Sequence, residues 1–211
     1  MNRRFKRHCS TKPSPDATST LLRIAFLYCL LIHNLQMSEN FFDLQPRLFG
    51  NSIYLRPLQV EDAESLYKVA RDPLIWEQHP SPLRYKRTVF DAEILLPALA
   101  SQSTLVAVDS KSNAIIGSSR YYDVDKNNFE LAIGFTFLAR SHWGGVVNAE
   151  MKNLMLTHAF KWAKRVWFHV GIENIRSQKA MEKIGAVLSH KEPRLLNGMP
   201  ITHCYYYVQT K

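Results

Sequence analysis

This 211-residue chain has little cysteine, and it contains no internal repeat or low-complexity tract. The three cysteines, Cys9, Cys29 and Cys204, lie far apart and form neither a metal-binding spacing nor a disulfide framework, which favours a reducing compartment. The apolar stretch at residues 21–32 is shorter than the ~20 residues that a membrane-spanning helix needs. We therefore expect a cytoplasmic protein without a metal site and without a stable membrane span.

Acidic residues are also few: 18 Asp and Glu stand against 27 Lys and Arg, which gives a net charge of +9. The charge is unevenly placed, because residues 1–36 carry +5 and residues 37–211 carry only +4. A mildly positive body suits an anionic cofactor and does not require nucleic acid as a partner. The apolar content of 46% and the charged content of 21% indicate a soluble, globular domain.

The first 36 residues have three interpretations. The apolar stretch at 21–32 resembles the hydrophobic region of a signal peptide, but no small-residue cleavage site follows it. A start rich in Arg, Ser and Thr and poor in acidic residues also resembles an organelle transit peptide. Alternatively, Met37 is the true first residue. In each case we expect residues 1–36 to lie outside the fold and residues 37–211 to form a single domain.

Hydrophobic periodicity predicts strands and helices that follow one another along the rest of the chain. The predicted strands cover residues 52–59, 104–109, 114–122, 129–138, 166–170 and 201–208, and the predicted helices cover 61–71, 88–101, 147–164 and 175–184. The second to fourth strands are joined by links too short for a crossover, so they form an antiparallel meander. Helices that interrupt a mixed, mostly antiparallel sheet indicate an α/β (α+β) fold with helices flanking the sheet.

A glycine turn lies between the strand at 129–138 and the helix at 147–164. It reads Trp143-Gly144-Gly145. Free amide donors and the positive end of the helix dipole gather at such a joint, and glycine lets a pyrophosphate approach the backbone. Arg140 and His142 flank the turn and can add positive charge. A plain turn remains the alternative at this point.

A second motif follows the next strand. Asn174 can cap the helix that begins after it, and Gly185 suits the end of that helix. Asn174, Ser177, Lys183 and Gly185 together form a more specific set than the glycine turn alone.

With these motifs in this order, the sequence resembles the GNAT superfamily of N-acetyltransferases, and especially its RimJ/RimL-like branch. The matching residues are Leu55-Arg56-Pro57-Leu58, Glu61-Asp62-Ala63, Ile133-Gly134-Phe135, Trp143-Gly144, Glu150, and the run of Asn174, Ser177, Lys183 and Gly185. The resemblance covers roughly residues 51–208. It implies a GNAT-like sheet with a splayed pair of strands.

The resemblance also implies acetyl-CoA as co-substrate and transfer of its acetyl group to a primary amine of a protein N-terminus or a small molecule. Backbone amides of the loop at 140–145 would hold the pyrophosphate, and the fourth strand would pair with the pantetheine arm. The implied cofactor-binding residues are Phe137, Leu138, Arg140, Ser141, His142, Trp143, Gly144, Gly145, Asn174 and Ser177.

Four positions depart from the family pattern. Val146 replaces the second glycine of the usual Gly-x-Gly loop, Ser141 replaces an Arg or Gln, Ala132 replaces a Glu, and Met181 replaces a Tyr that acts as general acid. Glu130 lies two positions before Ala132 on the same strand face, so it is our candidate for the general base that acetyl transfer to an amine requires.

The early loop holds Trp76, His79 and Tyr85, which could shape the acceptor pocket or simply pack. Two other functions stay open: a GNAT-like module that binds acyl-CoA without transferring it, and a basic protein associated with ribosomes or nucleic acid. The cluster of Lys161, Lys164 and Arg165 is equally explained by the dipole of the helix that it ends. A homodimer is also left open.

Overall fold

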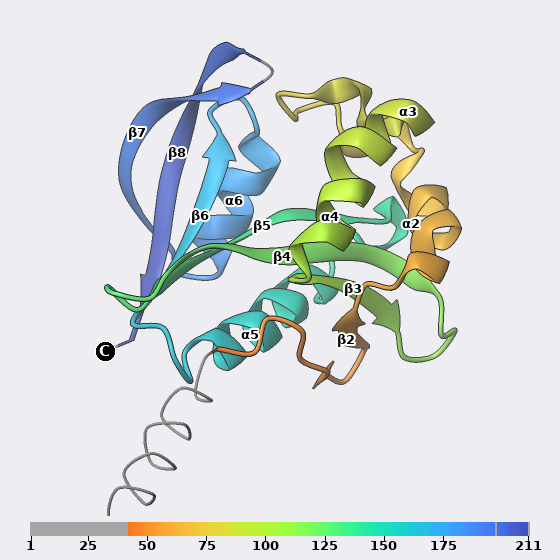
Figure 1. Ribbon diagram of the computed structural model, residues 1–211, viewed down its shortest axis with the longest axis horizontal. Coiled ribbons are helices and arrows are strands. Elements are labelled where there is room, and N and C mark those ends of the chain that lie inside the picture. Colours follow the sequence, from red (N-terminus) through yellow and green to blue (C-terminus); the bar gives the residue numbers. More distant parts are fainter. Residues whose placement is uncertain (1–41, 197, 211) are drawn as a thin grey trace, which may run out of the picture. The chain divides into compact units, whose positions relative to one another are not determined.

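The computed structural model describes residues 42–196 and 198–210 (Figure 1). The predictions for residues 1–36 and for Met37 lie outside the described residues. Within the described ranges, no helix is long and apolar enough to cross a bilayer.

Strands and helices follow one another much as the periodicity predicts. The strands are β1 (Leu48–Phe49), β2 (Ile53–Pro57), β3 (Thr104–Asp109), β4 (Ile115–Asp125), β5 (Glu130–Leu138), β6 (Arg165–Gly171), β7 (Val187–Leu196) and β8 (Met199–Gln209). The helices are α2 (Ala63–Ala70), α3 (Arg87–Phe90), α4 (Leu96–Ser101), α5 (Val147–Ala159) and α6 (Ile175–Lys183), with helical turns η1 (Val60–Asp62), η2 (Pro73–Ile75), η3 (Pro82–Tyr85), η4 (Asp91–Leu95) and η5 (Arg140–His142). All the predicted elements are present, α5 is shorter than predicted, and the short β1 and the ten-residue β7 were not predicted.

The described strands form one mixed sheet in the order β1-β2-β3-β4-β5-β6-β8-β7. Neighbours are antiparallel except for β5 and β6, which are parallel and are linked through α5. The predicted meander is confirmed as β3, β4 and β5. The sheet and its flanking helices confirm the predicted α/β (α+β) fold class (Figure 1).

The strands β5 and β6 separate soon after they begin. Their register pairs are Glu130 with Arg165, Leu131 with Val166 and Ala132 with Trp167, and pairing then stops. A bulge in β5 accompanies the separation, because Arg120 pairs with Gly134 but Ser118 pairs with Phe137. Phe135 takes a left-handed φ of 51° within this bulge. The predicted splayed pair is therefore present, with its apex at Ala132 and Trp167.

The sheet carries a hydrophobic core on each face. Alternation along β3 sends Leu105 and Ala107 to one core and Val106 and Val108 to the other. The first core packs against α5 and α6 and includes Leu131, Ile133, Met151, Met155, Phe168 and Met181. The second packs against α2, η4 and α4 and includes Leu66, Phe90, Ile94, Ala98 and Phe137. The gap between β5 and β6 therefore lies where both hydrophobic cores border the sheet.

Glu150 fixes the amino-terminal half of α5 to the turn before β2. Its Oε1 atom accepts hydrogen bonds from the amides of Asn51 and Ser52, the latter at 3.0 Å. This contact gives the family-matching glutamate a structural role and holds the start of α5 in place behind the sheet.

Candidate active site

A cavity of about 570 Å³ passes through the sheet at the gap between β5 and β6. Lys152 and Phe168 line it from the α5 face, whereas Trp76 and His169 line it from the opposite face. Side chains from both faces reach one cavity because the two strands share no ladder hydrogen bonds beyond their first three residues. Phe137, Leu138, Trp143, Gly144, Gly145, Asn174 and Ser177 also line it. Seven of the ten predicted cofactor-binding residues thus lie around one space.

The mouth of the cavity lies at the amino end of α5. Gly144 takes a left-handed φ of 72°, and nothing lies within 4 Å of the point where a Cβ would stand on Gly144 or Gly145. Among the described residues, the amides of Gly144, Gly145 and Val147 have no protein acceptor, and no side chain caps the helix. Open space, free amides and the helix dipole together make a site that fits a phosphate group.

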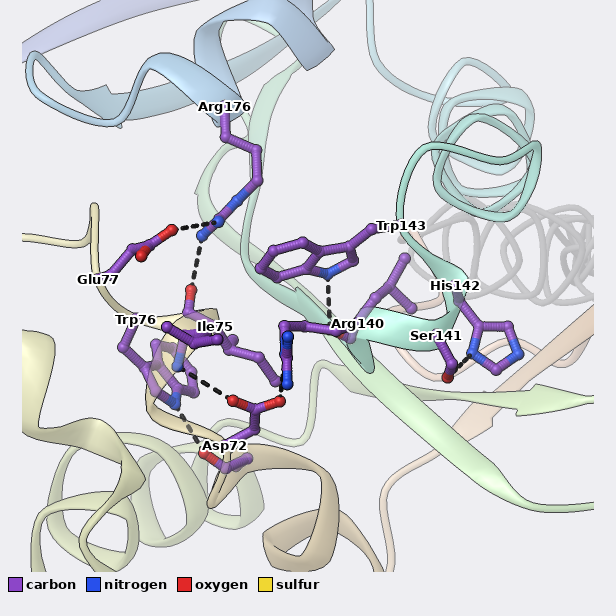
Figure 2. Close-up of polar contacts among 12 residues, drawn as sticks. Asp72, Ile75, Trp76, Glu77, Arg140, Ser141, His142, Trp143 and Arg176 are labelled. Atoms are coloured by element: carbon purple, nitrogen blue, oxygen red, sulfur yellow. Dashed lines mark hydrogen bonds and ion pairs between the residues drawn. The ribbon is translucent and has the colours of Figure 1, made fainter.

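The side chains of Arg140, Ser141 and His142 do not line the cavity. Arg140 forms an ion pair with Asp72, and the Ser141 hydroxyl lies 3.0 Å from His142 Nδ1 (Figure 2). The Nε2 atom of His142 faces Asp109 at 3.9 Å. These side chains therefore shape the loop from outside, and a contact between Arg140 or His142 and a bound phosphate is not supported by their orientation.

Trp143, which precedes the two glycines, contacts Arg176 of α6 at the same cavity. The Trp143 indole donates a hydrogen bond to the Leu138 carbonyl oxygen at 2.9 Å, and the Arg176 guanidinium lies 4.0 Å from the centre of the indole ring. Arg176 also donates to the Ile75 carbonyl oxygen at 2.7 Å and faces Glu77 at 3.5 Å (Figure 2). One arginine thus links η2, the glycine loop and α6. Arg176 was not among the predicted site residues, although it lies within the Asn-x-x-Ser motif.

Asn174 has the predicted capping role and also faces the cavity. Its Oδ1 atom accepts a hydrogen bond from the Ser177 amide at 3.1 Å, which caps α6. Both residues line the cavity, so the cap and a place beside a bound ligand are compatible.

The deep end of the gap holds a buried lysine. Lys152 is 3% exposed, and its Nζ atom donates a hydrogen bond to Thr136 Oγ1 at 2.7 Å. Burial lowers the pKa of Lys152 to about 7. The sequence could have predicted that Lys152 is buried. It lies three residues before Met155 and four before Leu156, so it shares the helix face on which both are buried.

Three imidazole rings, those of His79, His169 and His203, line the end of the cavity opposite α5. Burial lowers the pKa of His79 to about 3 and that of His169 to about 4, with Arg84 and Arg194 respectively acting in the same direction. His203 Nδ1 lies 2.8 Å from the Ile201 carbonyl oxygen. Because a carbonyl oxygen only accepts, Nδ1 donates to it, and Nε2 is the ring nitrogen that can act as an acceptor.

No aspartate or glutamate in the described part of the chain lines this cavity. Glu130 lies outside it, where its carboxylate accepts hydrogen bonds from the Trp167 indole at 2.7 Å and from Arg165 at 3.1 Å. Glu130 belongs to the paired end of β5, before the apex, so the structure does not bring it to the other predicted residues. Trp76 and His79 from the early loop do line the cavity, whereas Tyr85 does not.

His203 was not among the predicted site residues. It stands on β8 opposite Gly171, and the order of β6 and β8 in the sheet is what brings it to the cavity. Within residues 42–196 and 198–210, no group of His, Cys, Asp and Glu could hold a metal ion.

Comparison with known proteins agrees with this geometry. The family model described as an acetyltransferase (GNAT) domain matches residues 52–187. No curated protein matches the sequence significantly.

Many solved structures are similar to this chain. A proposed acetyltransferase from T. thermophilus is 27% identical, with a TM-score of 0.63 over 77% of this chain and 88% of that one. At lower identity the likeness concerns the fold alone. A proposed ribosomal-protein-serine acetyltransferase from Vibrio cholerae is 14% identical (TM-score 0.63, 78% of this chain and 98% of that one). The microcin C7 self-immunity acetyltransferase MccE, solved with acetyl-CoA and AMP, is 16% identical (TM-score 0.64, 80% and 99%).

Proposed function

Because the chain belongs to the family of GNAT acetyltransferase domains, we propose that it is an N-acetyltransferase that moves an acetyl group from acetyl-CoA to a primary amine. The observation that carries this proposal is the cavity through the sheet, which has free amides at its mouth and the neutral imidazoles of His79 and His169 on the face opposite α5. Such a cavity lets a co-substrate and an acceptor approach each other from opposite faces.

The mouth at Gly144 and Gly145 would hold the pyrophosphate of acetyl-CoA through backbone amides and the α5 dipole. Beyond the bulge, the β5 edge facing β6 is unpaired, so the backbone near Phe137 and Leu138 is available to the amides of the pantetheine arm. Asn174 would flank this arm from α6. Acetyl-CoA would then point its thioester toward the apex of the gap.

The charge of the cavity walls restricts the acceptor. Polyamines and aminoglycosides carry several ammonium groups, and the described walls offer no carboxylate to pair with them. Lys179 and Lys183 also line the cavity, so they would repel a polycation. We therefore favour a protein N-terminus or a small-molecule monoamine as acceptor. This choice is compatible with the RimJ/RimL-like branch but does not depend on it.

The acceptor amine must lose its proton before it attacks. A wall of neutral rings and apolar side chains disfavours the ammonium form and so lowers the pKa of a bound amine. His203 Nε2 can take the proton that the amine nitrogen loses as it attacks, because the other ring nitrogen, Nδ1, is held on the Ile201 carbonyl oxygen. We propose His203 as the base in place of Glu130, whose carboxylate is held outside the cavity by Trp167 and Arg165.

The test is release of CoA thiol from acetyl-CoA in the presence of separate amines. The panel contains peptides with free N-termini, small monoamines, spermine and an aminoglycoside, and calorimetry measures acetyl-CoA binding in parallel. Thiol release with a peptide or monoamine supports the proposal. Binding of acetyl-CoA without turnover on any amine would instead identify an acyl-CoA-binding module, the function to which Ala132 and Met181 point. Absence of acetyl-CoA binding would overturn both.

A further inference from the structure

Lys152 has more hydrogen-bonding capacity than its surroundings use. An ammonium group carries three donors, and in the described part of the chain its one hydrogen-bond partner is Thr136 Oγ1, at 2.7 Å. The Phe168 ring lies beside it, with its centre 5.3 Å from Nζ. Across the same residues, no carboxylate forms an ion pair with Lys152. A buried amine with unused donors on a cavity wall indicates a ligand that accepts from it.

The position of Lys152 along the gap identifies which part of a ligand it meets. Pairing of β5 and β6 ends at Ala132 and Trp167, and Phe168 is the next residue on β6. Lys152 packs against Phe168, so its Nζ atom lies close to the apex, whereas Gly144 and Asn174 lie at the mouth. A co-substrate whose phosphates remain at the mouth presents its acyl end to the apex.

A short polar chain fixes the direction of the lysine. Thr136 Oγ1, which accepts from Nζ, also lies 2.7 Å from Ser119 Oγ on β4. Ser119 is buried, and Thr136 follows the left-handed residue Phe135 in the β5 bulge. The bulge is therefore what turns Thr136 toward α5, so that Nζ contacts Thr136 of β5 and the Phe168 ring of β6.

We propose that Lys152 Nζ donates a hydrogen bond to the thioester carbonyl oxygen of acetyl-CoA and stabilises the negative charge that develops there. This inference rests on the proposed function. As the amine nitrogen bonds to the carbonyl carbon, an electron pair moves to the oxygen that Lys152 contacts. The nitrogen gives its surplus proton to His203 Nε2, the electron pair returns as the carbon–sulfur bond breaks, and the thiolate of CoA leaves and takes up a proton from solvent. Lys152 donates throughout and keeps its own protons, which both the ammonium and the neutral amine can do.

The decisive variant is Lys152→Met, which keeps the length of the side chain and removes every donor. We expect acetyl transfer at saturating acetyl-CoA to fall about 10²-fold, as for loss of one oxyanion donor. Affinity for free CoA, which has no thioester carbonyl, should stay within about threefold. Lys161→Met is the matched control, because Lys161 is exposed beyond the end of α5 and should leave the rate unchanged. A Lys152→Met rate equal to that of the wild type, or an equal loss of CoA affinity and rate, would overturn the proposal.

A binding measurement keeps the test independent of the acceptor. Acetyl-CoA is compared with S-ethyl-CoA, a thioether of nearly the same shape that lacks the carbonyl oxygen. We expect the wild type to prefer acetyl-CoA by about threefold to tenfold, the worth of one hydrogen bond, and Lys152→Met to lose this preference. If both proteins bind the two ligands equally, the carbonyl contact is absent, even if thiol release shows that the enzyme is active. If neither ligand binds to the wild type, the proposed function itself fails.

Lys152→Gln provides a second variant should Lys152→Met fold poorly, which thermal unfolding reports. Glutamine retains an N–H donor on a shorter chain, so its rate should lie between those of the wild type and of variants without a donor. The proposed contact depends on the length of the lysine side chain. It would be contradicted if Lys152→Gln had the wild-type rate and also kept the wild-type preference for acetyl-CoA over S-ethyl-CoA.

Discussion

Arg176 and Trp143 stack at the mouth of the cavity, with the guanidinium 4.0 Å from the centre of the indole ring. The contact joins α6 to the glycine loop, although the two residues are separated by the whole of α5 and β6. Both side chains are also anchored to backbone carbonyl oxygens, Arg176 to that of Ile75 and Trp143 to that of Leu138. The pair therefore sets the width of the mouth.

Arg176→Gln should weaken acetyl-CoA binding about tenfold. The change removes a cation from the ring and one hydrogen bond to Ile75, and a cation–π contact contributes ~0.5–2 kcal/mol. Calorimetry measures the affinity, and Arg71→Gln is the control because Arg71 is exposed at the end of α2. If Arg176→Gln and the wild type bind acetyl-CoA with equal affinity, Arg176 does not help to shape the acetyl-CoA site.

Gly145→Val should abolish binding of acetyl-CoA while the fold survives. The added side chain would stand in the open space where we place the pyrophosphate, and Gly145, unlike Gly144, does not have a left-handed φ, so the substitution does not impose that backbone strain. Circular dichroism checks folding, and titration with acetyl-CoA checks binding. Ala100→Val, an exposed substitution on α4, is the control. Unchanged binding in Gly145→Val would refute the phosphate loop.

His203→Gln should lower the rate of acetyl transfer about 10²-fold at saturating co-substrate, because the amine loses its proton acceptor. Glu130→Gln distinguishes the two candidate bases: it should change the rate by less than about threefold if His203 is the base. Steady-state kinetics with the best amine of the panel measures both. A large loss in Glu130→Gln combined with normal turnover in His203→Gln would restore the assignment made from the sequence.

Asp62→Asn should destabilise the fold at pH 7 by about 1–3 kcal/mol, because Asp62 accepts two hydrogen bonds from Arg56, each at 2.7 Å. Burial alone would raise the pKa of Asp62, but Arg56 and the Gln59 amide together lower it below its usual 3.8. This stabilisation is therefore present above pH 3.8 and is lost as the pH falls through the lower folded value. Urea unfolding from pH 7 to pH 2 should show the variant and the wild type converging. Glu61→Gln, at the exposed neighbour, should show no such pattern.

Local signals in the sequence were sufficient for most of the fold and for the mouth of the site. Periodicity located the sheet and its main helices, turn and cap chemistry drew attention to Gly144, Gly145 and Asn174, and the family resemblance implied that these residues and Ser177 bind the cofactor. β7 was missed because its residues from Val187 to Leu195 are exposed and mixed in polarity, so they show no buried stripe. A strand of this kind is specified by its partner β8 rather than by its own pattern.

The chemical end of the site was harder to predict because it depends on long-range placement. Glu130 was chosen from its position on β5, but the apex of the splayed pair falls after it. His203 reaches the cavity only because β8 lies next to β6 in the sheet. Lys152 is a charged residue among the buried residues of α5. Such a local conflict is expected at a functional site.

The few register pairs between β5 and β6 have a thermodynamic consequence for the whole domain. The sheet is held together across this line by three residue pairs and by the packing of α5 and α6 beneath it. A bound acetyl-CoA would bridge β1–β5 on one side and β6–β8 on the other, much as a missing strand would. Substrate occupancy should then raise the unfolding temperature with the logarithm of its concentration, and amide hydrogen exchange should slow on both sides of the seam.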